Sequence, residues 1–330
     1  MKETNIRPVD IMLENEKLHT EDVENILTKK SNFIFVSCPA CSLNKNKKVF
    51  SKKGFDFYEC LKCKTLFINS RPSFEVLSDF YTNSKSIQHW NDKIFPASEG
   101  ARRQNIFSPR AKKVVELCKK YATDTDNLYD VGAGFGTFCE EIKKLKTFQK
   151  VIAIEPSRSL AKTCRDKGIE VIEKTIEDAD LQGGANVITN FELIEHLFDP
   201  EDFIKSCHKA LVFGGLFIMT TPNIKGFDLM TLGSISNNIV GPNHLNYFHP
   251  TSITKLLARC GFEVLEILTP GKLDAELVRN KILSEEFDVS SQAFLKHILI
   301  DEWEKLGEKF QEFLADNLLS SHMWVVAKKI

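Results

Sequence analysis

The stretch LYDVGAGFGTF, residues 128–138, decides the fold class. It begins as an apolar segment and places Asp130 at the end of that segment. The turn that follows contains Gly132, Gly134 and Gly136. Glycine tolerates positive φ and lets a ligand approach the backbone closely. A strand, a glycine-rich turn and a helix in this order are typical of nucleotide-binding α/β sheets.

Outward from this stretch, the chain repeats the order of apolar strand, turn and amphipathic helix, which predicts a doubly wound parallel sheet. We therefore predict an α/β fold with a Rossmann-like sheet of seven strands, and the last two strands are consistent with an antiparallel addition at the sheet edge. The expected strands are near 127–131, 150–155, 169–173, 186–191, 214–220, 262–268 and 322–329. The expected helices cover about 136–146, 157–167, 200–211 and 251–260, with a helical insertion at about 273–317.

The glycine turn resembles motif I of class I S-adenosylmethionine (SAM)-dependent methyltransferases, and the resemblance covers roughly residues 100 to 270. It implies that Asp130 ends the first strand and that the glycines leave room for the methionine part of SAM. The dinucleotide fingerprint requires glycine or alanine three positions after Gly134, and Thr137 stands there. SAM is therefore expected as the cofactor in preference to NAD.

Downstream segments extend the resemblance in the correct order. Glu155 ends the second strand, where the resemblance implies that its carboxylate accepts the ribose hydroxyls. Asp178 follows the third strand, where a polar residue near the adenine amino group is implied, although Glu177 or Asp180 could serve equally. The segments NVITNFELIEHLFDP and LVFGGLFIMTTPN resemble the fourth and fifth strand motifs, and the first of these adds Phe191 and Glu192 to the expected cofactor site.

Four of the nine cysteines form two CxxC pairs separated by eighteen residues. This spacing lies within the range of structural zinc sites, in which two knuckles present four thiolates in a tetrahedron. We expect Cys38, Cys41, Cys60 and Cys63 to bind a structural Zn²⁺. The alternative is four unligated core thiols or a redox pair. The five remaining cysteines are expected to be buried free thiols.

Two histidine-containing segments provide candidates for removing a proton from the methyl acceptor. FELIEHLFDP contains Glu195 and His196, which resemble a pair found in many class I methyltransferases, and the resemblance implies that His196 either catalyses or lines the pocket. NHLNYFHP resembles the EHxxYF segment of zinc-containing sugar methyltransferases of bacterial secondary-metabolite and surface-glycan pathways. The resemblance implies that His244 and Tyr247 lie near the sugar, but Asn243 replaces the glutamate. His249 either catalyses or caps the helix that begins near residue 250.

The amino-terminal part resembles the same methyltransferase group through CPAC and FYECLKCKTLFINSRPSFEVLSDFY. In that group the helix after the ribbon covers the substrate, so Tyr81 and His89 are expected in the pocket. We expect no counterpart of the extra C-terminal domain of the longer sugar C-methyltransferases, and this expectation favours O- or N-methylation over C-methylation without excluding the latter. We expect a polar, partly helical lead at 1–32, a zinc ribbon at 33–70, a helical connector and substrate cover at 71–122, and a methyltransferase domain at 123–330.

Composition indicates an ordinary globular chain. The 44 basic and 45 acidic residues nearly cancel, so no overall field attracts nucleic acid or lipid. The amino terminus lacks the apolar core of a signal peptide, and no stretch approaches the roughly 20 apolar residues of a spanning helix. These features predict a cytoplasmic protein without a membrane partner. Within the lead, Thr20, Glu21 and Asp22 are expected to cap a short helix that ends at Leu27.

Three functions remain open. The leading hypothesis is methyl transfer to a sugar or nucleotide-linked sugar. The second is methylation of ribosomal or transfer RNA, because lysines such as Lys47 and Lys48 crowd the ribbon and could meet phosphate. The third is a catalytically silent, zinc- and SAM-binding partner subunit. The acceptor atom and the oligomeric state are not predicted.

Overall fold

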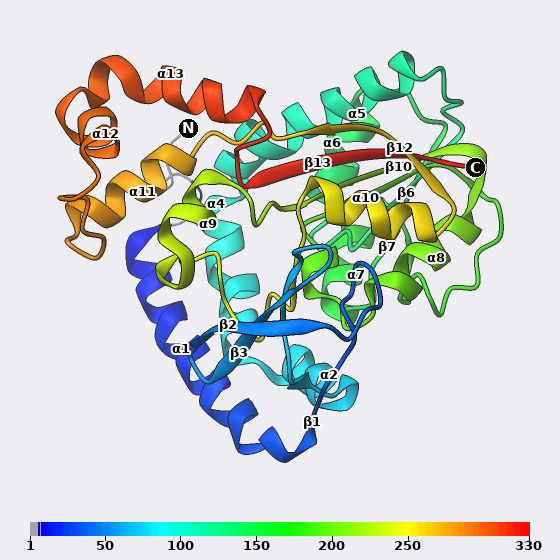
Figure 1. Cartoon of the computed structure of the whole chain (residues 1–330). Coiled ribbons are helices and arrows are strands. Elements are labelled where there is room, and N and C mark those ends of the chain that lie inside the picture. The colour runs from blue at the N-terminus through cyan, green and yellow to red at the C-terminus, as the bar shows by residue number, and fades with distance from the viewer. Residues whose placement is uncertain (1–5, 7) are drawn as a thin grey trace.

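The computed structural model describes residue 6 and residues 8–330, and its central feature is a seven-stranded sheet (Figure 1). Its strands are β6 (Asn127–Val131), β7 (Lys150–Ile154), β8 (Glu170–Ile172), β9 (Ala185–Phe191), β10 (Leu211–Pro222), β12 (Phe262–Leu268) and β13 (His322–Lys329). They lie in the order β12-β13-β10-β9-β6-β7-β8. The first five in chain order pair in parallel, and β13 is antiparallel to both β10 and β12. The predicted seven-stranded, Rossmann-like sheet is confirmed, but its antiparallel strand lies one position inside the edge, because β12 completes the sheet beyond it.

Helices cover both faces of this sheet, and each face has its own hydrophobic core. Leu216 and Ile218 of β10 point into one core, whereas Phe217 and Met219 point into the other. Such alternation is expected of a strand that is buried on both faces. One face is covered by α5 (Ser108–Lys120), α6 (Thr137–Lys144) and α7 (Arg158–Asp166), and the other by α8 (Pro200–Ala210) and α10 (Pro250–Arg259).

The cysteine segment folds into a small separate sheet, whose outermost strand comes from the distant NHLNYF segment. Its strands are β2 (Asn46–Lys52), β3 (Phe55–Cys60), β4 (Leu66–Ile68) and β11 (Asn246–Tyr247), in the order β11-β4-β3-β2. Beside it lies a two-stranded sheet of β1 (Phe33–Ile34) and β5 (Arg71–Pro72). Tyr247 pairs with Leu66 across the β4–β11 ladder. The predicted division of the chain at residues 32, 70 and 122 stays a prediction. The pairing of β4 with β11 joins the predicted ribbon, 33–70, to the predicted methyltransferase domain, 123–330.

The amino-terminal helix differs from the expected short helix. α1 (Val9–Thr28) runs through the proposed capping residues, and η2 (Lys30–Asn32) follows it. Inside α1, the Thr20 hydroxyl donates to the Glu16 carbonyl at 2.9 Å. Asp22 instead accepts from the Ser84 hydroxyl at 2.7 Å and from the Ser86 amide at 2.8 Å. The side chain therefore caps a different helix, one that tertiary packing brings beside α1.

An almost continuous helical path connects the two sheets. It consists of α2 (Phe74–Asn83), α3 (Lys85–His89), η3 (Trp90–Ile94), α4 (Phe95–Arg102) and η4 (Arg103–Phe107), and it leads directly into α5. The path lies within the part of the chain expected as a helical connector, residues 71–122. Two π-helical turns, η3 and η4, precede α4 and α5. Such turns often occur at functional sites, and α4 and η4 border the cleft described below.

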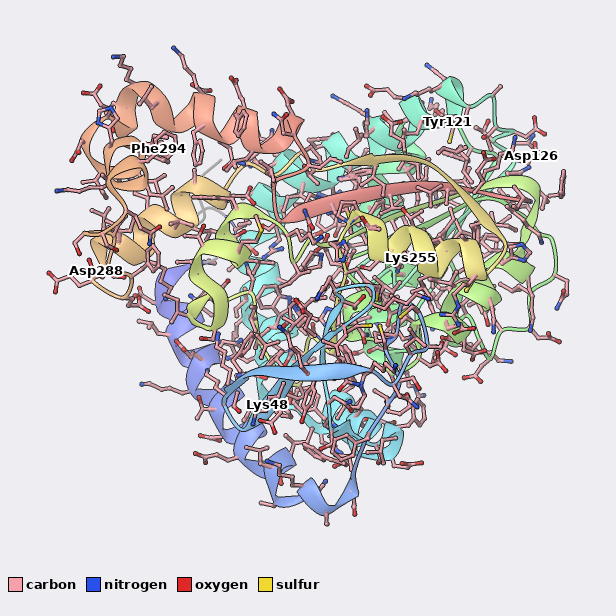
Figure 2. The ribbon with its side chains drawn as sticks, viewed as in Figure 1. Lys48, Tyr121, Asp126, Lys255, Asp288 and Phe294 are labelled. Carbon is pink, nitrogen blue, oxygen red and sulfur yellow. The ribbon has the colours of Figure 1, made fainter. Side chains whose placement is uncertain are left out.

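The last helical part is the predicted insertion between β12 and β13. It comprises α11 (Asp274–Leu283), α12 (Ala293–Lys296), η7 (His297–Asp301) and α13 (Trp303–Asp316), which share a core with α9 (Phe227–Leu232), just before η6 (Gly233–Ile235). Figure 2 labels Phe294 on this insertion and Lys48 on the cysteine module. The loop before η5 (Ile194–His196) leaves β9 and enters the cleft. Within the described residues, no helix has the length and apolarity needed to cross a membrane.

Candidate functional site

A cleft of about 3370 Å³ runs from the glycine turn to the helices that cover the cysteine module. One end is lined by the carboxyl ends of β6 and β7, which is where ligands bind in open α/β sheets. The other end is lined by side chains of α1, α2 and the loop before β11. The lining includes the predicted residues Tyr81, Asp130, Gly132, Gly134, Glu155, Phe191, Glu192, His196 and His244.

Glu155 links the two strand ends at the first end of the cleft. Its Oε2 accepts from the Gly134 amide at 2.8 Å, and its Oε1 accepts from the Ser157 amide at 2.9 Å. Burial raises the pKa of Glu155 to about 6, although both amide hydrogen bonds oppose the shift. Each carboxylate oxygen has a second lone pair for a ligand hydroxyl. A Cβ added at Gly134 would meet no atom within 4 Å, so this position faces open space.

Asp130 has a more internal position. Its Oδ1 accepts from the Thr189 hydroxyl of β9 at 2.8 Å, and its Oδ2 accepts weakly from the Cys139 thiol of α6 at 3.4 Å. Burial raises the pKa of Asp130 to about 6. The carboxyl group therefore ties β6 to its neighbours while it borders the cleft.

Aromatic and cationic side chains that were not predicted complete this end. Phe135, between two of the turn glycines, stacks on Phe95 of α4 with ring centroids 3.8 Å apart. Arg110 of α5 places its guanidinium 4.4 Å from the Phe191 ring centroid and 3.7 Å from the Glu192 carboxylate. Phe135 stands in the quoted motif, but only the fold shows that a distant helix covers it.

Glu192 is held by several groups at the end of β9. The Thr220 hydroxyl donates to its Oε1 at 2.5 Å, and His322 Nδ1 lies 3.4 Å from the same oxygen. The backbone of Glu192 has φ of 53°, which fixes the direction in which the chain leaves the strand. The structure thus places Phe191 and Glu192 together with Arg110 in one wall of the cleft.

His196 and His244 meet farther along the cleft. Their rings lie edge to face with centroids 4.7 Å apart. His196 Nδ1 lies 2.7 Å from the Asn243 carbonyl, and His244 Nδ1 lies 3.2 Å from the Asn238 carbonyl. A carbonyl can only accept, so each Nδ1 is the protonated nitrogen and each neutral ring has its lone pair on Nε2. Burial lowers the pKa of His196, which favours this neutral form.

Glu195 lies beside the two histidines. Only 1% of its surface is exposed, and its Oε2 accepts from the Thr221 hydroxyl at 2.9 Å. Its Oε1 is 4.0 Å from His196 Nε2. One ligand atom from each of Glu195, His196 and His244 lies within 4.8 Å of the other two. The sequence paired this carboxylate with His196, and in the structure Glu195 lies in η5 with its side chain buried beside that ring.

Asn243, which replaces the glutamate of the EHxxYF pattern, connects this cluster to the amino-terminal helices. Its backbone carbonyl oxygen accepts from His196 Nδ1 and also from the Tyr81 hydroxyl, the latter at 3.3 Å. Its side-chain oxygen lies 3.1 Å from Nε2 of the buried His19 of α1. Asn243 therefore links the loop before β11 to α1 and α2. His19 is a cleft residue that the sequence did not single out.

Two residues expected near the acceptor lie elsewhere. Tyr247 is fully buried, and its hydroxyl accepts from the Val240 amide at 2.9 Å. His249 Nε2 lies 2.7 Å from the Cys63 carbonyl, and its backbone amide donates to the Ser252 hydroxyl at 2.9 Å at the start of α10. Neither side chain lines the cleft, because β11 joins the small sheet and turns both away.

Three further expected residues also lie outside the lining. Asp178 is exposed, and its carboxylate accepts from the Thr175 hydroxyl at 2.9 Å. Gly136 starts α6, where an added Cβ would lie 2.7 Å from Ile169 and 2.9 Å from the Cys164 thiol, so it provides close packing. His89 of α3 lies 4.0 Å from the Glu14 carboxylate. Thr175 borders the cleft where Asp178 was expected.

The four cysteines of the small sheet come together as expected. Their sulfur atoms all lie within 4.8 Å of one another, with 3.4 Å between Cys38 and Cys63 and 3.6 Å between Cys41 and Cys60. Tetrahedral zinc with bonds of about 2.3 Å places its sulfur ligands about 3.8 Å apart. The residues after the two pairs, Ser42 and Lys64, both have positive φ, so the two turns are alike. The donor set and its spacing fit Zn²⁺.

Lysines of this module are partly neutralised by acids. Lys48 lies 2.7 Å from Asp56, and both Lys47 and Lys64 lie within 3.8 Å of Glu59. These exposed pairs contribute little to stability, but they reduce the local positive charge that phosphate would meet.

Comparisons with known proteins agree with this geometry. A family model described as a methyltransferase domain matches residues 101–267, about half of the chain. A probable SAM-dependent methyltransferase of Mycolicibacterium smegmatis is 34% identical over 83 residues, which cover 25% of this chain and 30% of that protein. A ubiquinone biosynthesis O-methyltransferase of Bradyrhizobium diazoefficiens is 27% identical over 185 residues, 51% of this chain and 66% of the relative. The chain thus spans less than two-thirds of the length of these relatives.

A carboxy-S-adenosyl-L-methionine synthase of Shewanella pealeana is 25% identical over 159 residues, 44% of this chain and 63% of that protein. Among solved structures, a SAM-dependent methyltransferase from Archaeoglobus fulgidus aligns with a TM-score of 0.49 and 18% identity, over 72% of this chain and all of that chain. Through residues 101–267, which contain the glycine turn, Glu155 and the histidine of η5, the chain belongs to the methyltransferase domain family.

Proposed function

We propose that the chain is a SAM-dependent methyltransferase that acts on a hydroxyl of a small molecule. The observation that carries this proposal is a single cleft with two chemically different ends. Gly134 and Glu155 line one end, and His196 and His244 line the other. A methyltransferase needs this arrangement, because it must align an acceptor with the methyl group and remove a proton from it.

The first end fits SAM. When bound, SAM supplies an electrophilic methyl group. The Glu155 carboxylate, already fixed by two backbone amides, can accept the ribose hydroxyls. Gly134 leaves space beside it. Arg110 and Glu192 fix the wall that carries Phe191, so these residues orient the cofactor without reorganising.

At the second end, the histidines can receive the acceptor proton. The Asn243 and Asn238 carbonyls orient both rings with Nε2 as the lone-pair nitrogen. In this arrangement an acceptor hydroxyl donates to Nε2, and its oxygen becomes a better nucleophile as the proton moves. The Glu192 carboxylate lies close by, and its charge stabilises a protonated ring.

Within this reaction class we favour a sugar or a nucleotide-linked sugar. The support is the resemblance of CPAC and HLNYF to the zinc-containing sugar enzymes, together with polar cleft residues such as His19, Asn243 and Tyr81. A ring with several hydroxyls needs such hydrogen-bonding groups. One relative is named an O-methyltransferase of ubiquinone biosynthesis, so a ubiquinone precursor is the acceptor to compare with a sugar. The paired lysines disfavour RNA.

The four cysteines are proposed to bind one structural Zn²⁺. Cys38, Cys60 and Cys63 share a core with α10 and Phe248, and His249 binds the carbonyl of Cys63. The metal would therefore stabilise the small sheet that supports the loop with Asn243 and His244. All four ligand positions are filled by protein, so no position is left for substrate.

The decisive experiment is calorimetric titration of the zinc-loaded chain with SAM and with NAD, followed by a transfer assay with nucleotide sugars, catechols and total RNA. We expect SAM to bind, NAD not to bind, and a nucleotide sugar to be methylated. SAM binding without transfer to any acceptor would support the silent-subunit alternative. Transfer only to RNA, or no binding of SAM, would overturn the proposal.

A further inference from the structure

We propose that Glu195, His196 and His244 form a second metal site, one that binds a divalent transition ion at the acceptor end of the cleft. The cysteine cluster is separate from it in both residues and chemistry. The site itself follows from the geometry of these three side chains. Its role in the reaction rests on the proposed function.

The three donors converge from two parts of the chain. Glu195 and His196 belong to η5, and His244 belongs to the loop before β11. One ligand atom from each lies within 4.8 Å of the others. An ion with bonds of about 2.1 Å holds neighbouring donors about 3 to 3.5 Å apart. Small side-chain rotations therefore suffice to close the set around an ion.

The outer hydrogen bonds are those of a metal site. A metal-binding histidine usually donates its other ring N–H to a carbonyl or a carboxylate, which fixes the ring and the tautomer. His196 and His244 both direct Nδ1 to backbone carbonyls, at 2.7 and 3.2 Å. The second oxygen of Glu195 accepts from Thr221 at 2.9 Å. Each proposed ligand thus has a partner that orients it toward the common point.

Burial supports a cation at this point. The Glu195 side chain is 1% exposed, and Glu192 is a second acid nearby. A carboxylate removed from water requires compensation by a cation or by several donors. Its Oε2 accepts from the Thr221 hydroxyl, its Oε1 lies 4.0 Å from His196 Nε2, and its own backbone amide and the charge of Arg110 also act on the carboxylate. An ion bound by the carboxylate and both imidazoles would supply that compensation.

The donor types select the ion. Two imidazole nitrogens and one carboxylate favour Mn²⁺, Fe²⁺, Co²⁺, Ni²⁺ or Zn²⁺, whereas Ca²⁺ and Mg²⁺ prefer oxygen ligands. Three protein ligands leave coordination positions open. Because the cluster borders the cleft, oxygen atoms of an acceptor can reach those positions. A bound ion would lower the pKa of such a hydroxyl, so its proton would pass to water in the cleft. With the ion present, His196 and His244 would hold the ion instead of accepting that proton.

The test uses the full chain with zinc retained in the cysteine cluster. The protein is first dialysed against a weak chelator and then titrated with Mn²⁺, and bound ion is measured by electron paramagnetic resonance. We expect one additional ion per chain. Glu195→Gln and His244→Gln should each weaken Mn²⁺ binding at least tenfold, whereas His297→Gln, which changes an exposed histidine of η7, should leave it unchanged.

Co²⁺ provides an independent readout. Bound by nitrogen and oxygen, it should show weak visible bands without the intense sulfur-to-cobalt absorption that thiolate ligands give. Calorimetry with SAM on every variant establishes that the cofactor end still folds. If the wild-type chain binds SAM but no second ion, or if Glu195→Gln and His244→Gln bind Mn²⁺ as tightly as wild type, the metal site is overturned while the proposed function stands. Failure of the wild type to bind SAM would instead overturn the proposed function.

Discussion

The two ends of the cleft are built in different ways. The cofactor end comes mainly from one continuous segment, in which the glycine turn and Glu155 lie about two dozen residues apart. The acceptor end combines His19 of α1, Tyr81 of α2, His196 of η5 and the Asn243–His244 pair. A local motif can therefore define the first end, whereas only the tertiary fold defines the second.

This difference separates two measurable quantities. Side chains of the first end should control the affinity for SAM, and side chains of the second should control the rate of transfer to the acceptor. Substitutions at the cofactor end should leave the rate of transfer almost unchanged, and substitutions at the acceptor end should leave the SAM affinity almost unchanged. The reason is that no residue named above contacts both Glu155 and His196.

The largest expected effect is on the rate of transfer. His196→Gln keeps a side chain of similar length but removes the lone-pair nitrogen, whether that nitrogen accepts a proton or binds an ion. We expect kcat to fall by about 10²- to 10⁴-fold, the usual contribution of a general base. Single-turnover kinetics with saturating SAM would measure it. An equal loss in SAM affinity would show that the two ends are not independent, and His297→Gln serves as the control.

The next effect concerns cofactor affinity. Glu155→Gln removes the charge that accepts the ribose hydroxyls and also weakens the bonds to the Gly134 and Ser157 amides. Charge-assisted hydrogen bonds contribute about 1.5–3 kcal/mol each, so we expect SAM to bind roughly 100-fold more weakly. Calorimetry measures the change. Asp178→Asn is the matched control, because Asp178 is exposed and lies outside the cleft lining; a comparable loss there would restore it to the cofactor site.

Protonation of Glu155 should produce a smaller effect of the same kind. Burial raises its pKa from 4.5 to about 6, and a protonated carboxyl is a poorer acceptor. SAM affinity should therefore fall by roughly tenfold between pH 7 and pH 5, since one pKa unit corresponds to a tenfold change in the ionised fraction. Burial of Asp130 raises its pKa to about 6 as well, so the matching Glu155→Gln titration is needed to separate the two groups. A flat profile in the wild type would contradict the assignment.

The raised pKa of Glu155 makes folding stability depend on pH in the direction opposite to SAM affinity. The pKa of Glu155 in the folded chain is above its unfolded value, so the folded state binds the proton more tightly. The contribution of this group to stability is therefore largest below about pH 4.5 and decreases as the pH rises through about 6. Acid should favour folding at this site while it weakens SAM binding.

Sequence patterns predicted the fold well because the signals were local. The alternation of β10 and the glycine turn before α6 each depend on neighbouring residues. The sequence did not show that β13 lies between β10 and β12, because strand order is set by packing between distant segments. The prediction that a helix starts at Thr20 was wrong for the same reason, because Asp22 instead accepts hydrogen bonds from Ser84 and Ser86 at the start of α3.

For the candidate site, spacing placed the cysteines and Glu155 but not the acceptor residues. Arg110 and His19 carry no motif of their own, and they enter the cleft because helices direct them inward. The resemblance to EHxxYF selected the correct loop. It could not show that β11 pairs with β4, which turns Tyr247 into the small sheet while His244 stays in the cleft.

The smallest expected effect distinguishes the two halves of that loop. Tyr247→Phe removes a hydroxyl that accepts from the Val240 amide and donates weakly to the Asn238 carbonyl at 3.5 Å, but the side chain does not line the cleft. Loss of a neutral hydrogen bond costs about 1 kcal/mol, so thermal unfolding should shift down by a few degrees, while kcat and SAM affinity change less than twofold. If kcat instead fell by tenfold or more with unchanged stability, Tyr247 would act on the acceptor, and the acceptor end would extend into the small sheet.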